Sequence, residues 1–432
     1  MIQKKSLILI GGSGRNVGKT LFACRLIGRH SRERAVTGIK ITVVDSAVAE
    51  DAGRSGSGGY RAFDGPFQIL EETAPSPDTD TGRMLEAGAR RVLWLKAKRD
   101  HLRAGIEALL GLIPDKACCI AEGTSARTVI EPGAFLILRG EGAAAMKDSC
   151  AAVLPFADRV ARFRDRAWDV RLEDCLYVED EWMLRPDAGA LILAGGGSRR
   201  MGRDKALLPL GGKPMIAVVA DQLKALFEEI AVSADPRSTL DFLGLPIFPD
   251  LEPGQGPLMA IASSLPRMTH ELNFVTACDI PRLNLPFVNR LVKSALGCDL
   301  VLPYYDGDMY LGDTFSGTCP PGTCPRFYEP LHAVYRKSVV PEARRILAAG
   351  GRSILDLLGR IKVNRVEIPD RGWIRNINTE EEYAELAAEM GKYEMGTCTT
   401  GTHSLACAEM GTCTLGTHSL ACVPKVRVPP RK

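Results

Sequence analysis

The chain has little of what directs proteins to membranes or nucleic acids. Its 55 basic and 52 acidic residues leave a net charge of only +3, which gives no reason to expect either partner. No apolar run approaches the roughly 20 residues of a membrane span. The short apolar start, residues 6–10, runs directly into a glycine-rich loop, so it predicts a first strand rather than a secretory signal. We therefore expect a cytoplasmic protein.

Histidine is scarce, with six residues, and none lies in a motif typical of a catalytic histidine. The 13 cysteines are odd in number and scattered through apolar segments, which does not indicate a disulfide framework in a cytosolic chain of this size. Cys24, Cys175, Cys278 and Cys298 are typical of small buried hydrophobic residues.

A tandem repeat, in which residues 394–408 recur as 409–423 with two changes, contains four further cysteines and two of the histidines: Cys398, Cys407, Cys413, Cys422, His403 and His418. The repeat suggests two interpretations: a metal site and a low-complexity tail. It contains no close Cys-x-x-Cys or His-x-x-x-His pair, so we predict a disordered tail over 391–432. A related Gly-Thr-Cys run predicts a loop insertion at 304–325.

Length and composition predict a globular protein of two or three domains. Alternating strand and helix patterns predict two α/β units, residues 1–175 and 188–390, joined by an acidic linker at 176–187. The strands that we expect are 6–10, 35–44, 91–95, 117–121, 190–194, 230–233, 273–277 and 300–303. The helices that we expect are 18–30, 101–112, 215–229, 257–265, 286–296, 340–349 and 379–390, with loops at 50–60 and 73–82.

The most informative segment follows the strand at 190–194 and reads Leu-Ala-Gly-Gly-Gly-Ser-Arg-Arg-Met-Gly-Arg-Asp-Lys over residues 193–205. Glycines let the backbone approach a phosphate, and free N–H groups in such a loop point at anions. Arg200 and Lys205 fit as ligands of a triphosphate, where they would stabilise charge as pyrophosphate leaves. The segment therefore predicts a nucleotide site.

A different phosphate loop spans residues 11–20 and ends in Gly18-Lys19-Thr20. The common spacing requires glycine at position 13, which is Ser13, so this loop is one residue longer. Lys19 would reach the β- and γ-phosphates and Thr20 would hold Mg²⁺ at the helix N-terminus. Glu122 follows a strand and is either an acidic partner of this Mg²⁺ or a solvated turn residue.

Two carboxylates complete the second nucleotide site. Asp250 lies in the polar loop 249–258, which is suited to line a base or ribose pocket. Asp279 comes at the carboxyl end of the strand at 273–277, the edge where open α/β sheets bind ligands. A carboxylate there is well placed to hold Mg²⁺ against the α- and β-phosphates.

Residues 188–390 resemble the molybdenum cofactor guanylyltransferase family. The resemblance rests on the 193–205 segment, Gly256-Pro-Leu258, Cys278-Asp-Ile-Pro281, Glu329-Pro-Leu-His-Ala333 and Asn376-Ile-Asn-Thr379. It implies a Rossmann-like nucleotidyltransferase fold that joins GMP from GTP to molybdopterin and releases pyrophosphate. It implies Mg²⁺ on Asp279 and substrate contacts from Leu193, Ala194, Gly195, Gly196, Lys205, Asp250, Asn376 and Asn378. Met259-Ala260 departs from the family's usual Ala-Gly and bears on the pterin pocket.

Residues 1–175 resemble the GTP-binding adapter of the same pathway, a P-loop NTPase-like domain. This resemblance rests on Gly18-Lys-Thr20, Gly38-Ile-Lys-Ile41, Glu86-Ala-Gly88 and Glu122-Gly123. Such adapters are often fused to the transferase or partnered with it. The resemblance implies GTP on Gly18, Lys19 and Thr20, Mg²⁺ on Thr20 and Glu122, and partners that deliver molybdopterin or mature molybdoenzymes.

Three alternatives remain open at this stage. A cytidylyltransferase acting on the same cofactor would share the fold, although Gly195 favours guanine because the cytidine branch usually reads Leu-Ala-Ala-Gly. A sugar-1-phosphate nucleotidyltransferase usually reads Gly-x-Gly-Thr-Arg-Leu. A non-catalytic GTP-binding carrier would bind GTP through Lys19 and release no pyrophosphate.

Overall fold

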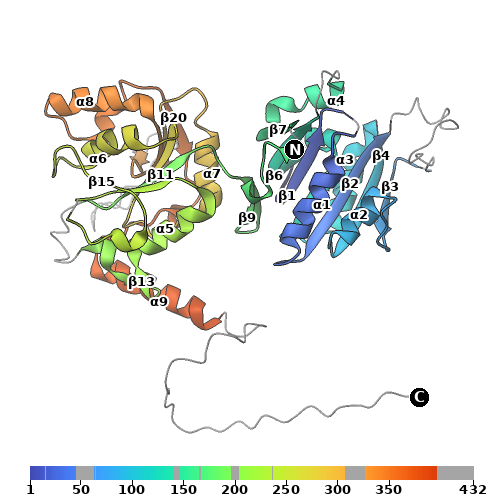
Figure 1. The fold of residues 1–432 in the computed structure, drawn as a ribbon, viewed down its shortest axis with the longest axis horizontal. Coiled ribbons are helices and arrows are strands. Elements are labelled where there is room, and N and C mark those ends of the chain that lie inside the picture. Colours follow the sequence, from blue (N-terminus) through green and yellow to red (C-terminus); the bar gives the residue numbers. More distant parts are fainter. Residues whose placement is uncertain are drawn as a thin grey trace, which may run out of the picture.

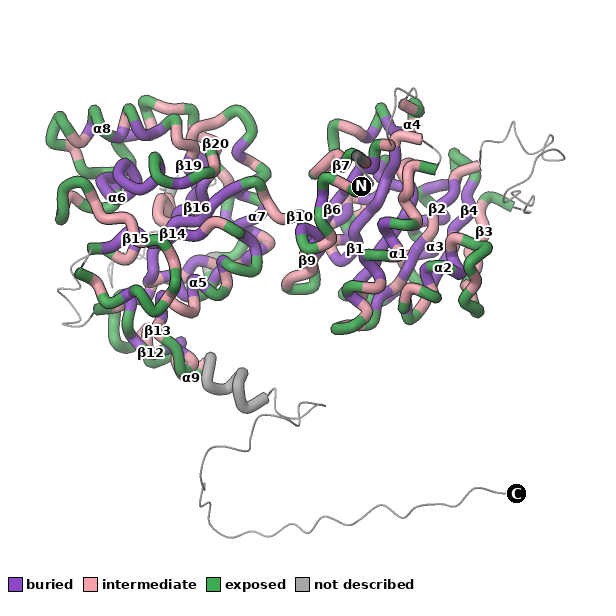
Figure 2. Tube along the Cα trace, in the orientation of Figure 1, coloured by how far each residue is buried: buried purple, intermediate pink, exposed green. Residues whose placement is uncertain are grey.

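The computed structural model describes residues 1–14, 16–44, 63, 65–140, 146–164, 167–195, 204–235, 237–306 and 326–396. These residues form two α/β units, each built around its own sheet (Figure 1). The buried stretches of chain run through the interior of each unit (Figure 2). Among the described residues, no helix combines the length and apolar character needed to cross a membrane. The predicted mixed α/β class is confirmed.

The first unit contains an eight-stranded sheet in the order β3-β4-β2-β5-β1-β6-β7-β8. The six central strands are parallel, and the edge strands β3 and β8 run antiparallel. The strands are β1 Ile2–Gly12, β2 Val36–Val44, β3 Phe67–Glu72, β4 Arg91–Lys98, β5 Cys118–Glu122, β6 Ile130–Arg139, β7 Arg159–Arg164 and β8 Ala167–Trp168. The helices are α1 Lys19–His30, α2 Asp80–Glu86, α3 Leu102–Gly111 and α4 Asp148–Ala151.

Helices cover both faces of this sheet, which explains why central segments such as residues 7–10 of β1 and 118–121 of β5 are apolar on both faces. Alternate residues of β1 point to opposite faces: Ile8 and Ile10 pack with α1, whereas Leu7 and Leu9 pack with α3. The loop predicted at 73–82 ends earlier than expected, because Thr79 caps α2 by accepting a hydrogen bond from the Gly82 N–H.

Residues 176–187, predicted to be a linker, instead contain an antiparallel hairpin of β9 Cys175–Val178 and β10 Glu181–Leu184. Glu179 and Asp180 both have positive φ, which is the backbone of a two-residue type I′ turn. Trp182 is fully buried against the first sheet. The acidic turn has the composition of a linker, but the residues on either side of it pair as two strands and pack against the first sheet.

The second unit contains a sheet in the order β15-β14-β11-β16-β19-β17-β18, with β20 beside β17. The strands are β11 Gly189–Leu193, β14 Ile230–Ser233, β15 Ile247–Phe248, β16 Leu272–Ala277, β17 Leu300–Asp306, β18 Arg326–Tyr328, β19 His332–Arg336 and β20 Val363–Glu367. A small ribbon pairs β12 Pro209–Leu210 with β13 Lys213–Pro214. The helices are α5 Met215–Leu226, α6 Pro257–Ser264, α7 Leu285–Lys293, α8 Val340–Ala348 and α9 Glu380–Gly396.

The layers of the second unit follow from its central strand. Ala190 and Ile192 of β11 pack with α5 and α7, whereas Leu191 and Leu193 pack with α6 and α8. Strand β19 runs antiparallel to both β16 and β17. The eight strands predicted from the sequence are all present as β1, β2, β4, β5, β11, β14, β16 and β17, and the other described strands, among them β3, β6, β19 and β20, were not predicted.

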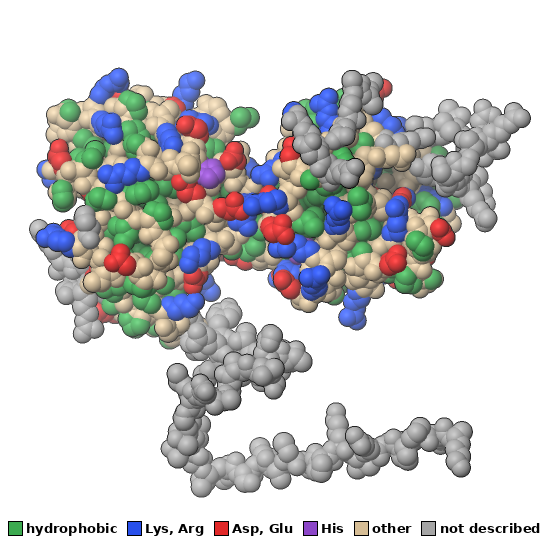
Figure 3. All heavy atoms as spheres, viewed as in Figure 1, with side chains coloured by type: hydrophobic (Ala, Val, Ile, Leu, Met, Phe, Trp, Pro, Cys, Tyr) green, Lys and Arg blue, Asp and Glu red, His purple; other side chains and the backbone are tan. Residues whose placement is uncertain are grey.

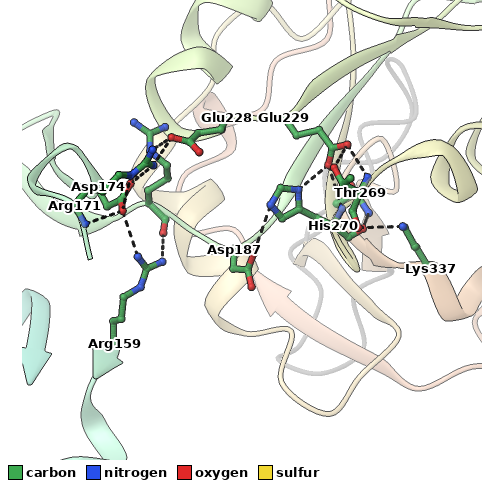
Figure 4. Close-up of polar contacts among 11 residues, drawn as sticks. Arg159, Arg171, Asp174, Asp187, Glu228, Glu229, Thr269, His270 and Lys337 are labelled. Atoms are coloured by element: carbon green, nitrogen blue, oxygen red, sulfur yellow. Dashed lines mark hydrogen bonds and ion pairs between the residues drawn. The ribbon is translucent and has the colours of Figure 1, made fainter. Parts of the chain in front are cut away.

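Charged side chains join the two units (Figure 3). Arg171 of the first unit pairs with Asp174 at 2.8 Å and also with Glu228, which follows α5 of the second unit (Figure 4). A second bridge joins Lys293 Nζ to Asp158 Oδ1 at 2.7 Å. Burial alone would raise the pKa of the neighbouring Glu229 carboxyl, but hydrogen bonds from Thr269 and His270 lower this pKa to about 2.

Candidate functional site

The predicted nucleotide site of the second unit lies at the carboxyl edge of its parallel strands. Leu193 ends β11 beside Ala277 of β16, and the Leu193 carbonyl accepts a hydrogen bond from the Cys278 N–H at 3.0 Å. The Ala194 N–H donates to the Ser233 carbonyl at 2.8 Å. A Cβ added to Gly195 would meet no atom of the described residues within 4 Å. The predicted ligands Gly196 and Arg200 lie outside the described residues.

Lys205 is the centre of this site. Its Nζ lies 2.8 Å from the Ile377 carbonyl oxygen, 3.2 Å from Asn378 Oδ1 and 3.3 Å from Asp279 Oδ2. The Ile377 N–H donates to the Asp279 carbonyl at 2.9 Å, so the backbone also connects these segments. The structure thus brings together three predicted residues, Lys205, Asp279 and Asn378, from distant parts of the chain.

Asp250 lies on the β14 side of the same edge. Its Oδ1 accepts a hydrogen bond from Ser233 Oγ at 3.1 Å, and the carbonyl of Ser233 is the one that binds the Ala194 N–H. Burial raises the pKa of the Asp250 carboxyl, although the Ser233 hydroxyl opposes the shift. Asp250 is therefore connected through one residue to the backbone predicted to hold the nucleotide.

Glu329 is a site residue to which the sequence assigned no role. Burial raises the pKa of Glu329, the nearby charge of Asp279 adds to the shift, and a hydrogen bond to Asn376 opposes it. Glu329 directly precedes Pro330 before β19, and its position in the 329–333 motif was the available signal. A carboxylate beside Asp279 thus anchors the predicted pterin-side residue Asn376.

The donor set fits a hard divalent cation. Asp279 and Glu329 offer carboxylate oxygens and Asn378 offers an amide oxygen, which are ligands that Mg²⁺ accepts alongside phosphate oxygens and water. Within the described part of the chain, no group of three or more His, Cys, Asp or Glu residues has the geometry of a metal cage. A site of this kind is suited to a cation that arrives with a nucleotide.

The first unit has its own constellation at the carboxyl edge of β1 and β5. Ile10 lies beside Glu122 in the parallel register, and Thr20 Oγ1 donates to Glu122 Oε2 at 2.7 Å. Glu122 is buried, which raises the pKa of its carboxyl, so it is not the solvated turn residue of the alternative interpretation. Burial lowers the pKa of Lys19, whose Nζ donates to the Gly14 carbonyl at 3.2 Å.

Lys40 and Asp80 lie at the same edge and were missed by the sequence analysis. Lys40 Nζ pairs with Asp80 and lies 3.9 Å from Glu122 Oε1. Burial alone would raise the pKa of the Asp80 carboxyl, but the hydrogen bonds and positive charges of Lys40 and Arg83 lower it. Lys40 lies in the Gly38–Ile41 motif, but Asp80 reaches it only because α2 packs beside β2.

Comparisons with known proteins agree with this architecture in the second unit. The family described as the MobA-like NTP transferase domain matches residues 190–363, and the first unit lies outside that match. The probable molybdenum cofactor guanylyltransferase of Carboxydothermus hydrogenoformans is 32% identical over 202 residues, which cover 45% of this chain and 92% of the relative. The protein of the same description from Methanosarcina acetivorans is 31% identical over 227 residues, covering 48% and 93%.

Among solved structures, molybdopterin-guanine dinucleotide biosynthesis protein A from Archaeoglobus fulgidus is 24% identical, with a TM-score of 0.39, and the match covers 47% of this chain and 99% of that one. The family assignment rests on the sequence relatives, nearly the whole of which this chain covers. The chain therefore belongs to the molybdenum cofactor guanylyltransferase family and is a nucleotidyltransferase.

Proposed function

We propose that residues 188–390 transfer GMP from GTP to molybdopterin, with or without bound molybdenum, giving molybdopterin guanine dinucleotide and pyrophosphate. The observation that carries this proposal is the convergence of Lys205, Asp279 and Asn378 at the carboxyl edge of β11 and β16. The relatives described as guanylyltransferases favour guanine over cytosine. The descriptions of these relatives do not support a sugar-1-phosphate substrate.

The reaction is attack by the terminal phosphate of molybdopterin on the α-phosphorus of GTP, with pyrophosphate leaving. A phosphate monoester is already a nucleophile near neutral pH, so no protein base has to remove a proton. The backbone of residues 193–196 holds the nucleotide, and Lys205 and Arg200 neutralise charge on the phosphates. Asn376 and Asn378 lie toward the pterin, and Asp250 lies toward the nucleoside.

Mg²⁺ fits this site with Asp279 as its protein ligand and Glu329 nearby. When bound, the ion neutralises charge on the α- and β-phosphates. The chain's own contribution is positional. The Ile377 carbonyl accepts from the Lys205 side chain, and the Ile377 N–H donates to the main-chain carbonyl of Asp279, so the Lys205 ammonium and the backbone that carries Asp279 are held relative to one another before substrates arrive.

The test is to mix the full chain with molybdopterin, Mg²⁺ and either GTP or CTP, and to identify the product by mass. We expect the mass of molybdopterin joined to GMP, together with released pyrophosphate, and Asp279→Ala should abolish the formation of this product. Asp221→Ala, which removes an exposed carboxylate on α5 of the same unit, is the matched control and should retain activity. A CMP adduct would overturn the choice of base, and tight GTP binding without any adduct would favour the carrier alternative.

The first unit, residues 1–175, acts in this proposal as the GTP-binding adapter of the same pathway, in the cytoplasm. Lys19 binds the β- and γ-phosphates, and Thr20 and Glu122 hold Mg²⁺, which their hydrogen-bonded oxygens fit. Proteins that deliver molybdopterin or mature molybdoenzymes are the expected partners. The test is calorimetric titration of the full chain with GTP, in which Lys19→Ala should remove one of two binding events.

A further inference from the structure

An indole ring packs on the last glycine of the first unit's phosphate loop. A Cβ built on Gly18 would lie only 2.8 Å from Cζ2 of Trp168, and the φ of Gly18 is +81°. The ring is held edge-on by Phe163 at a centroid distance of 4.9 Å and by Phe22 at 6.2 Å. Trp168 Nε1 is buried and, among the described residues, has no hydrogen-bond partner.

Sheet register explains why Trp168 reaches the loop. Gly12 of β1 lies beside Leu138 of β6, and Leu138 lies beside Ala161 of β7. Phe163, two residues further along β7, pairs with Trp168 on the antiparallel edge strand β8. Trp168 is therefore placed just beyond the level at which β1 becomes the phosphate loop, on the edge of the sheet where a ligand would bind.

The flank on which Trp168 lies is opposite to the metal-binding flank. Glu122, the partner of Thr20, ends β5 on one side of β1, whereas β6, β7 and β8 lie on the other side. A nucleotide whose phosphates occupy the loop with its metal end toward β5 must extend its nucleoside over the β6–β8 side. Leu21 lies one helical turn after Gly18 and is 47% exposed although it is large and apolar.

We propose that Trp168 is the base platform of the amino-terminal nucleotide site, stacking on the purine of a nucleoside triphosphate while Leu21 provides an apolar contact beside it. This inference rests on the proposal that Lys19 and Thr20 bind the phosphates. A tryptophan face offers a large π surface to any base, and in proteins that bind single-stranded nucleic acids the removal of such a ring weakens binding by roughly tenfold for each stacked base. The guanine preference would come from polar groups at the base edge rather than from the ring.

The experiment is isothermal titration calorimetry on the full chain carrying Lys205→Ala, which weakens the transferase site. GTP and inorganic tripolyphosphate are titrated separately, both with Mg²⁺. Trp168→Ala should weaken GTP binding roughly tenfold and leave tripolyphosphate binding unchanged, because only GTP carries a base. The GTP affinity of Trp168→Phe should stay within about threefold of that of the parent. Trp373→Phe, in the other unit, is the matched control and should bind GTP as the parent does.

Each other outcome overturns the inference in a distinguishable way. Equal weakening of GTP and tripolyphosphate would show that Trp168 only supports the loop at Gly18, and no weakening of either would show that the ring does not touch the ligand. Unchanged GTP affinity in Lys19→Ala would refute the phosphate-loop proposal itself, and the inference with it.

Tryptophan emission decides the matter if Trp168→Ala fails to fold by circular dichroism. GTP should then quench the tryptophan fluorescence of the parent, and Trp168→Phe should lose most of this quenching. An unchanged quench in Trp168→Phe would overturn the inference.

Discussion

His332 makes the second unit sensitive to acid. The residue lies at the start of β19, is fully buried, and has neither ring nitrogen hydrogen-bonded within the described part of the chain. Its ring centroid is 4.9 Å from that of Phe274, edge-on, and 6.3 Å from that of Phe287, nearly parallel. Burial lowers the pKa of His332 to about 3, so the folded protein keeps it neutral.

The magnitude follows from linkage between protonation and unfolding. The imidazole of the unfolded chain has a pKa of 6.5, whereas that of the folded protein is about 3. Between these values only the unfolded state binds the proton, so stability is complete above pH 6.5 and is lost as pH falls. Each pH unit in this window corresponds to about 1.4 kcal/mol, so lowering the pH from 7 to 4.5 removes about 3 kcal/mol through this residue alone.

The assay is urea-induced unfolding of the parent and of His332→Leu at pH 7 and pH 4.5. We expect the parent to lose about 3 kcal/mol more than the variant between the two pH values, since other titrating groups are shared and cancel. His101→Gln, at an exposed position, is the control and should behave as the parent does. Equal losses in the parent and in His332→Leu would refute the reasoning.

Three further predictions concern other parts of the chain. Gly133→Ala should destabilise the first unit by more than about 3 kcal/mol in urea, because the new Cβ would lie 2.5 Å from the Trp182 carbonyl; a change under about 1 kcal/mol would contradict this packing. Glu122→Gln keeps the shape of a buried carboxylate without its charge, so Mg²⁺ should no longer strengthen GTP binding in calorimetry; an unchanged response to Mg²⁺ would exclude the assigned role. Glu228→Gln removes the exposed pair with Arg171 but leaves Arg171 on the buried Asp174, so the thermal midpoint should be unchanged within error, whereas a clear shift would show that the exposed ion pair stabilises the chain.

The strands that carry the motifs were predictable because they are buried on both faces. Residues 6–10 and 190–194 are almost wholly apolar, and 273–277 is a buried stretch interrupted only by Asn273 and Thr276; all three lie in central strands of their sheets. The hairpin at 175–184 was not predictable in the same way, because its acidic turn dominates the local composition. Only its contacts with the first sheet show that it belongs to that unit.

The candidate site was predictable where a residue lies next to a recognisable loop or strand end. Lys205, Asp279 and Thr20 are of this kind. Glu329, and Trp168 of the inferred base platform, are not, because each reaches its position only through the register of several strands, and a single sequence carries no direct record of such pairings. The missed residues therefore come from strand neighbours distant in sequence.

The two units share a way of holding lysine in advance of a ligand. Lys19 donates to the carbonyl of Gly14, and Lys205 donates to the carbonyl of Ile377. A carbonyl oxygen orients an ammonium group without supplying a compensating negative charge. In the second unit the carbonyl contact, at 2.8 Å, is shorter than the 3.3 Å contact with Asp279. Asp279 can therefore turn to a cation while Lys205 stays in place, which is what a site that works by positioning and charge requires.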